Sequence, residues 1–177
     1  YTIAGVSIPT TNYVADYLPL SIGLQSRTAT FRLMGDYQRG NFFTTLSAAY
    51  QKRAAITIDR NAYFTTEMVY SNEVAMPDVI NINLRTGYRS GRLIAEAILD
   101  NQVTQGGFDI TKNNMPFPSN TMNALRIGMH SKYTFPGKEA LSLVGGFNHV
   151  LDGRNVGQTN AIYAGFFYII NFNKKIQ

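Results

Sequence analysis

Apolar and polar residues alternate along much of the chain, and residues 161–172 (AIYAGFFYIINF) show this most clearly. The even-numbered positions of this stretch are all apolar or aromatic, whereas the odd-numbered ones mix small and polar groups among apolar ones. Because successive side chains of a strand point to opposite faces, one face of such a strand suits lipid. About 9–11 residues of tilted strand cross a bilayer, so this stretch predicts a transmembrane strand.

The same period of two predicts seven further strands earlier in the chain. They cover residues 1–8, 28–38, 42–58, 79–89, 92–103, 123–135 and 140–151. Within residues 20–38 the apolar positions change parity, which predicts a bulge or a turn at residues 25–28. A turn there would change the strand count by one.

Short and long connections alternate between the predicted strands. The short ones are residues 39–41, 90–91 and 136–139, and the long ones are residues 59–78, 105–122 and 152–159. Ser90-Gly91 predicts a two-residue hairpin with positive φ at the glycine. Outer-membrane barrels have short periplasmic turns and long extracellular loops. The pattern therefore predicts an all-β, antiparallel up-and-down transmembrane β-barrel of about eight strands in the outer membrane, with a periplasmic C-terminus.

Composition agrees with this prediction and removes other classes of protein. Residues 1–177 form a single barrel domain or a part of a longer one. No apolar run approaches the roughly 18 residues of a spanning helix, which excludes a helical membrane protein. With 11 Tyr and 11 Phe, the chain can supply interfacial aromatic girdles. It has no cysteine, which removes disulfides and the commonest zinc sites.

The net charge of +5 raises the alternative of nucleic-acid binding. The basic residues are spread along the chain rather than gathered into a stripe with aromatic residues between them. We therefore expect no nucleic acid as a partner.

With the apolar positions against lipid, the opposite positions of the strands point toward an enclosed interior. The candidates for this lumen-facing set are Arg32, Asp36, Arg85, Arg92, Glu96, Arg126, His130 and Lys132. Their excess of positive charge is consistent with an anion-favouring pore. An eight-stranded barrel, however, is just wide enough for side chains to fill, so the same groups are also consistent with a watertight network.

The long loops carry aromatic and apolar residues that suggest a partner surface. These candidates are Tyr63, Phe64, Tyr70, Met115 and Phe117. The alternative is that these side chains fold over the mouth of the barrel or extend its strands.

Catalytic and metal chemistry have little support in the sequence. His149 and Asp152 are the one pair that could form an oriented general base, since a carboxylate can orient an imidazole. His130 has no partner at metal-ligand spacing. We predict no enzyme activity and no cofactor, and keep an outer-membrane barrel enzyme with His149 and Asp152 as an alternative.

The run LSLVGGFNHVLD at residues 141–152, followed by Gly153-Arg154-Asn155 and a last strand ending in Phe172, resembles the final two strands of TonB-dependent receptors. It is also similar to other outer-membrane barrels of Bacteroidota. The resemblance covers roughly the last 35 residues, and the chain contains no recognisable plug domain or TonB box. It implies a C-terminal barrel fragment, or a smaller barrel of similar hairpins, that serves substrate passage across the outer membrane.

The sequence thus predicts an outer-membrane barrel with a porin-like or receptor-like transport role, or with a structural and partner-binding role in the envelope. The expected partners are outer-membrane lipid and lipopolysaccharide, with a protein partner at the extracellular loops. A soluble ligand-binding β-barrel is the main rival, because parity alone does not say which face is inside.

Overall fold

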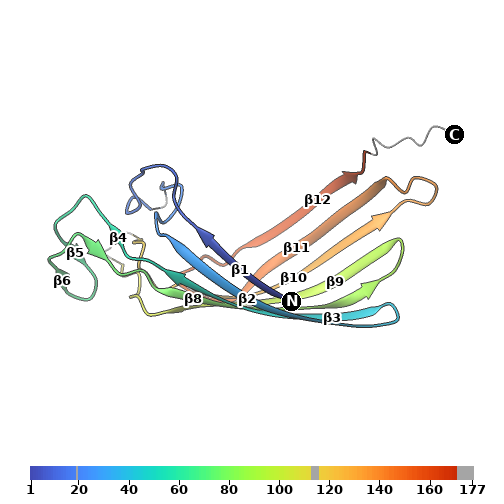
Figure 1. The fold of residues 1–177 in the computed structure, drawn as a ribbon, viewed down its shortest axis with the longest axis horizontal. Coiled ribbons are helices and arrows are strands. Elements are labelled where there is room, and N and C mark those ends of the chain that lie inside the picture. Colours follow the sequence, from blue (N-terminus) through green and yellow to red (C-terminus); the bar gives the residue numbers. More distant parts are fainter. Residues whose placement is uncertain (19, 113–115, 171–177) are drawn as a thin grey trace.

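The computed structural model describes residues 1–18, 20–112 and 116–170, and every element in them is a β-strand (Figure 1). In this part of the chain eight strands form one antiparallel sheet in the order β1-β2-β3-β8-β9-β10-β11-β12. The strands are β1 (Thr2–Ser7), β2 (Thr28–Arg39), β3 (Phe42–Arg53), β8 (Asp78–Arg89), β9 (Leu93–Gln105), β10 (Asn123–Thr134), β11 (Leu141–Arg154) and β12 (Asn160–Tyr168). All neighbours in the chain are neighbours in the sheet, apart from four short strands inserted between β3 and β8.

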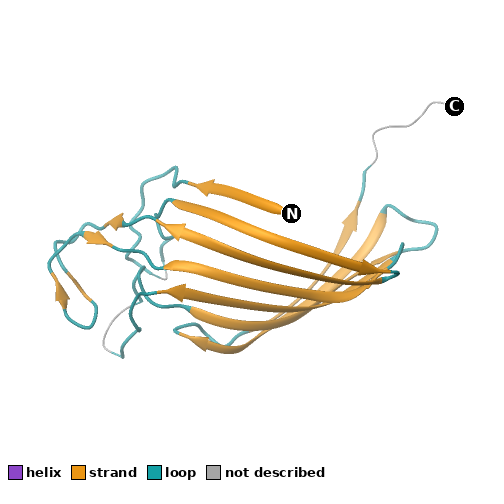
Figure 2. Cartoon of the chain, turned by 60° about the horizontal axis from the view of Figure 1, so that its bottom comes forward, coloured by secondary structure: helices purple, strands orange, loops and turns teal. Residues whose placement is uncertain are grey.

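The sheet has two different ends, which we call the turn end and the loop end. At the turn end, β2 joins β3, β8 joins β9, and β10 joins β11 through short connections (Figure 2). Gly40 and Gly137 adopt positive φ angles of 59° and 73° in two of these turns, a conformation that glycine adopts without strain. At the loop end, residues 8–27, 54–77, 106–122 and 155–159 connect the other strand pairs. The predicted sorting by length holds for the long connections at residues 8–27, 54–77 and 106–122, but residues 155–159 at the loop end are no longer than residues 135–140 at the turn end.

Several local predictions need correction. Gly91 does not have the positive φ expected of the predicted Ser90-Gly91 hairpin; instead the Ser90 backbone N–H donates to the Leu93 carbonyl oxygen at 2.8 Å, so the turn is displaced by one residue and encloses Gly91 and Arg92. Residues 20–27 are loop, with Gln25 at φ 54°, so the parity change reflects a strand that begins only at Thr28. The strand predicted at 42–58 ends at Arg53.

The sheet does not close. β1 and β12 are each paired on one side only, so the closed barrel predicted from the sequence is an open, bent sheet in the structure (Figure 1). What the structure establishes is an all-β, antiparallel fold. No helix in the residues it describes is long and apolar enough to cross a membrane.

Glycines hold adjacent strands close together on one face of the sheet. A Cβ added at Gly87, Gly128 or Gly146 would overlap backbone atoms of the neighbouring strand. Glycine in a strand commonly marks a close approach or a tight bend of this kind. These positions therefore help to bend the sheet.

The loops at the loop end form a small packed body of their own, which we call the loop cap (residues 8–18, 20–27, 54–77, 106–112 and 116–122). It contains two short antiparallel pairs, β4 (Ile56–Thr57) with β7 (Glu73–Val74), and β5 (Tyr63–Phe64) with β6 (Met68–Val69). Its buried core consists of Ala15, Ile56, Ile58, Val74, Met76 and Phe117. Three separate loops thus share one hydrophobic core.

Candidate functional site

One face of the eight-stranded sheet, here called the apolar face, is exposed and almost without charge. Directly opposite residues in adjacent strands share a face, and Leu46, Leu84, Leu99 and Ile127 form one such row. None of the described side chains on this face is buried. Its charged residues lie only near the strand ends: Arg39 at the turn end, and Lys52, Asp78, Asp152 and Arg154 at the loop end.

The apolar face ends in a row of aromatic side chains at the turn end. Its members are Tyr37, Phe42, Tyr88, Tyr133 and Tyr168. Phe42 and Tyr88 are opposite each other and make an edge-to-face contact with ring centroids 5.6 Å apart. On β8 the apolar residues between Ile80 and Tyr88 extend about 26 Å along the strand, at about 3.3 Å per residue.

The other face, here called the polar face, is the sheltered one. Buried residues of the long strands all belong to it: Phe43, Ser47, Ala49, Val79, Glu96, Thr104, Ala124, Gly128, Ser142 and Val150. A soluble sheet buries its apolar face and exposes its polar one. This sheet has the reverse arrangement.

Ion pairs cross the middle of the polar face between adjacent strands. Arg85 of β8 binds Glu96 of β9 at 3.2 Å, and Glu96 is only 8% exposed. Arg126 of β10 binds Asp100 of β9 at 3.0 Å. Asp100 also accepts hydrogen bonds from the side-chain amides of Asn81 and Asn83, at 3.0 and 3.1 Å. The buried Glu96 carboxylate is therefore paired with a cation, as burial of charge requires, and the half-buried Asp100 accepts three hydrogen bonds.

A hollow of about 440 Å³ lies beside this network on the polar face. It is lined by Arg85, Asp100, Arg126 and His130 among others. His130 Nδ1 lies 2.8 Å from the hydroxyl oxygen of Tyr163, so the imidazole has a neutral hydrogen-bond partner. The hollow thus combines cations, carboxylates and a histidine.

The predicted lumen-facing residues lie on the polar face, with one exception. Seven of the eight lie in strands on the polar face: Arg32, Asp36, Arg85, Glu96, Arg126, His130 and Lys132. Arg92 lies in the turn that precedes β9. Asp36 is hydrogen-bonded to the hydroxyl group of Thr45 on the next strand. The structure brings Arg85, Glu96 and Arg126 together and leaves Arg32 apart from them.

Packing of the loop cap buries some of the residues predicted to form a partner surface and leaves others exposed. Phe117 is 7% exposed and stacks on Tyr63 with centroids 5.2 Å apart. Phe117 therefore belongs to the core of the loop cap, and the half-buried Tyr63 packs against that core. Phe64 and Tyr70 are exposed, Tyr70 at 86%. Met115 lies outside the described residues.

An ion pair between a buried carboxylate and a half-exposed arginine joins two loops within the cap. Asp16 of residues 8–27 accepts a hydrogen bond of 2.6 Å from Nε of Arg60, which belongs to residues 54–77. The Arg60 guanidinium also lies 5.9 Å from the centroid of the Phe117 ring. The cap is therefore held by charge as well as by its hydrophobic core.

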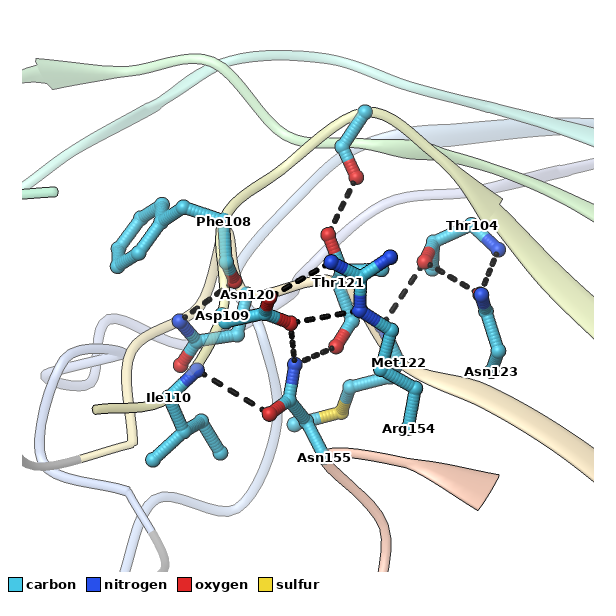
Figure 3. Close-up of polar contacts among 11 residues, drawn as sticks. Thr104, Phe108, Asp109, Ile110, Asn120, Thr121, Met122, Asn123, Arg154 and Asn155 are labelled. Atoms are coloured by element: carbon cyan, nitrogen blue, oxygen red, sulfur yellow. Dashed lines mark hydrogen bonds and ion pairs between the residues drawn. The ribbon is translucent and has the colours of Figure 1, made fainter. Parts of the chain in front are cut away.

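A second polar cluster fastens residues 106–122 to the end of β11 (Figure 3). The guanidinium of Arg154 donates to both carboxylate oxygens of Asp109, at 2.7 and 2.6 Å. The amide nitrogen of Asn155 donates to Asp109 Oδ1 and to the Thr121 carbonyl oxygen, both at 2.8 Å. These bonds hold the pKa of Asp109 at about 2, below its ordinary value, chiefly through Arg154.

The sequence did not reveal these loop contacts. Asp16, Arg60, Asp109 and Arg154 are more than 40 residues from their partners, and nothing in a period of two relates them. The Gly153-Arg154-Asn155 run was noted only for its resemblance to other barrels, and it proves to contain the anchor of the loop. Positive φ at Asn155, 58°, places its side chain toward that loop.

The catalytic alternative loses its geometric basis. His149 Nδ1 lies 2.6 Å from Oδ1 of Asn160, rather than against Asp152. Asp152 and Gly153 belong to β11, so the connection predicted at residues 152–159 begins only after Arg154. In the described residues no three His, Asp or Glu side chains are arranged to hold a metal ion.

No family model, curated protein or solved structure matches this chain. The site is therefore interpreted from its own geometry.

Proposed function

We propose that the chain forms a transmembrane β-barrel, or the strands of part of one, in the bacterial outer membrane. A transport role follows, in which the apolar face contacts lipid and the polar face encloses the path of small polar solutes. The observation that carries the proposal is the inverted arrangement of the sheet, with exposed apolar residues on one face and, on the other, ion pairs that include the buried carboxylate of Glu96. In water such a face would expose a large contiguous apolar patch, which soluble monomers rarely do.

Dimensions and flanking groups support the same proposal. An outer-membrane barrel has an apolar band about 25 Å tall between aromatic girdles, and its strands alternate between lipid and lumen. The apolar face of this sheet has a band of that order and an aromatic row at the turn end. Lipid and lipopolysaccharide are the partners that such a surface would contact.

Open sheet edges cannot remain unpaired in hydrocarbon, where no water satisfies the backbone. β1 and β12 run antiparallel to each other, since strand direction alternates across the eight strands. In the membrane we expect these edges to pair, with each other or with additional strands. In both cases the apolar face would contact lipid.

The test is to express the chain in a Gram-negative host with an export signal and to fractionate the envelope. We expect outer-membrane location, extraction only with detergent, and faster gel migration of the unheated sample than of the heated one. A chain that remains monomeric and folded in buffer without detergent would contradict the proposal. It would favour the soluble ligand-binding barrel.

A structural, non-conducting barrel is the second candidate, and one observation favours it. The carboxylates of Glu96 and Asp100 are both bound by arginines across neighbouring strands, a pattern that can fill a narrow interior. Planar bilayers separate the two roles. Conductance supports transport, whereas a correctly inserted but silent protein supports an envelope or partner-binding role.

A further inference from the structure

Charged side chains of three neighbouring strands gather around the hollow on the polar face. Arg85 comes from β8, Glu96 and Asp100 come from β9, and Arg126 comes from β10. Both guanidiniums bind carboxylates of β9, at 3.2 Å to Glu96 and at 3.0 Å to Asp100. They are therefore held beside the same strand, one from each side of it.

Alternation along β9 places an apolar side chain between the two ion pairs. Glu96, Ile98 and Asp100 share the polar face. The two acidic residues are thus about 13 Å apart along the strand, at about 3.3 Å per residue. Ile98 lines the hollow between them, together with its direct neighbour Gly128 on β10. The floor of the hollow is apolar, and its two ends are charged.

Polar groups without a carboxylate or a guanidinium complete the lining on the side of β11 and β12. Asn148 of β11 lies opposite Gly128 and contributes an exposed side-chain amide. Tyr163 of β12 contributes its hydroxyl group, 2.8 Å from His130 Nδ1, and the two rings stack with centroids 6.0 Å apart. Amide, imidazole and hydroxyl groups together supply donors and acceptors. This side therefore offers hydrogen bonds next to ring surfaces.

The charges of the two ion pairs balance. The positive charges of Arg85 and Arg126 are matched by the negative charges of Glu96 and Asp100. A charged ligand would meet no net opposite charge in these pairs, and it would compete with them. Both arginine side chains are partly exposed, so their remaining N–H groups can reach a ligand oxygen. A neutral ligand with several hydroxyl groups uses these donors without breaking either pair.

We propose that the hollow binds a neutral polyhydroxylated solute, of the size of a mono- or disaccharide. Its volume of about 440 Å³ lies within the range of ordinary ligand pockets, about 300–1,000 Å³. Hydroxyl groups of the solute bond to the amide and guanidinium groups at the rim, while the less polar face of the sugar ring packs on Ile98 and Tyr163. The site rests on the proposed transport function and deepens it, since it names the class of solute that enters the interior of the barrel.

The experiment is saturation-transfer difference NMR of the protein, folded in a detergent without a sugar headgroup, with glucose and maltose as probes. Glucuronate and glucosamine add a negative or a positive charge to the same kind of ring and are the comparison ligands. We expect saturation transfer to glucose and maltose. Titration should give several-fold weaker binding for both charged sugars, because neither finds a counter-charge in the hollow.

Two variants test the hollow itself. Asn148→Leu removes the amide at the rim with little change of volume, and Tyr163→Phe removes one hydroxyl group. Each should weaken glucose binding about two- to tenfold, as for loss of a neutral hydrogen bond. Asn101→Leu is the matched control, because it makes the same change on the apolar face of β9, opposite Leu125. It should leave glucose binding unchanged.

Four results would overturn the site: no saturation transfer to either neutral sugar, charged sugars bound as tightly as glucose, full affinity in both hollow variants, or equal weakening in Asn101→Leu. Gel mobility of unheated and heated samples tests the barrel separately. A heat-modifiable protein that binds neither sugar refutes the site alone. A protein that folds without detergent and binds glucose refutes the barrel alone.

Discussion

Ile98 and Leu99 are consecutive residues of β9 whose side chains lie on opposite faces of the sheet. Leu99 is opposite Leu84 and Ile127 on the apolar face, whereas Ile98 is opposite Arg85 and Gly128 on the polar face. Both lie near the middle of the strand. They therefore report on the environment of the two faces at nearly the same depth.

Substitution of these two residues by arginine distinguishes a membrane barrel from a soluble one. Leu99→Arg should destabilise insertion by about 2–4 kcal/mol, the cost of a cation on the lipid face at the bilayer midplane. Ile98→Arg places the cation among polar groups and should insert. Urea titration of folding into lipid vesicles, followed by the heat-dependent mobility shift, measures both. If Leu99→Arg inserts and Ile98→Arg does not, the polar face forms a core without water, and the membrane barrel is contradicted.

The sequence predicted the long strands, and which connections lie at the same end of the sheet, because both depend on local pattern. A period of two identifies which residues share a face, and Ile80, Ile82 and Leu84 are on one face as expected. Whether the sheet closes is not a local property. It depends on the stagger between β1 and β12, which no run of residues encodes by itself.

The loop cap was the least predictable part of the molecule. Phe117 lies between prolines in an irregular segment, where the sequence left open both an exposed partner surface and packing over the barrel mouth, and its stacking partner Tyr63 lies in another loop. Loops that pack on each other carry no periodic signal, so their core residues resemble exposed ones. The partners of Asp16 and Asp109 were hidden for the same reason.

The residue register also predicts where the sheet edges would join. From Asn160, directly opposite residues lead across the sheet through His149, Ile127, Leu99, Leu84 and Leu46 to Gly35. Gly35 lies beyond Leu33, the partner of Thr2, so β1 and β12 do not overlap without a stagger. Eight strands at a tilt of 35–45° close with a stagger of about ten residues.

A stagger of ten places Val6 opposite Ala164, and an even number keeps both on the apolar face. Because the chain has no cysteine, Val6→Cys with Ala164→Cys introduces the only thiols. We expect an intramolecular disulfide after oxidation, seen as a mobility change on a non-reducing gel. Val6→Cys with Asn160→Cys is the mismatched control. Intermolecular bonds would indicate pairing between copies, and none at all would indicate intervening strands.

Phe117→Ala should open the loop cap. Loss of a buried phenyl ring generally lowers the free energy of unfolding by about 3–5 kcal/mol. Here the ring belongs to the small core of the loop cap. Limited tryptic digestion should then cleave at Arg60 or Lys112 at least several-fold faster. Tyr70→Ala, which changes an exposed ring in the same cap, should digest like the unmodified protein; equal acceleration in both would argue against a shared core.

The contact of Asp109 with Arg154 should depend on pH. The folded pKa of Asp109, about 2, is lower than the ordinary value, so the contact stabilises fully above about pH 4 and weakens as pH falls toward 2. Asp109→Asn should therefore raise hydrogen exchange in residues 106–112 at neutral pH and have little effect near pH 2. Glu67→Gln serves as a control elsewhere in the cap. An effect of Asp109→Asn that is the same at both pH values would contradict this account.

The unequal length of the connections means that a solute would meet two very different entrances. On one side, the described strands reverse within a few residues of the aromatic row, so these turns would cover little of the opening, and Arg89 and Lys132 lie near it on the polar face. On the other side, anything entering must first pass a folded assembly with its own core. The loop end would therefore select solutes by shape, and the turn end would select them by charge.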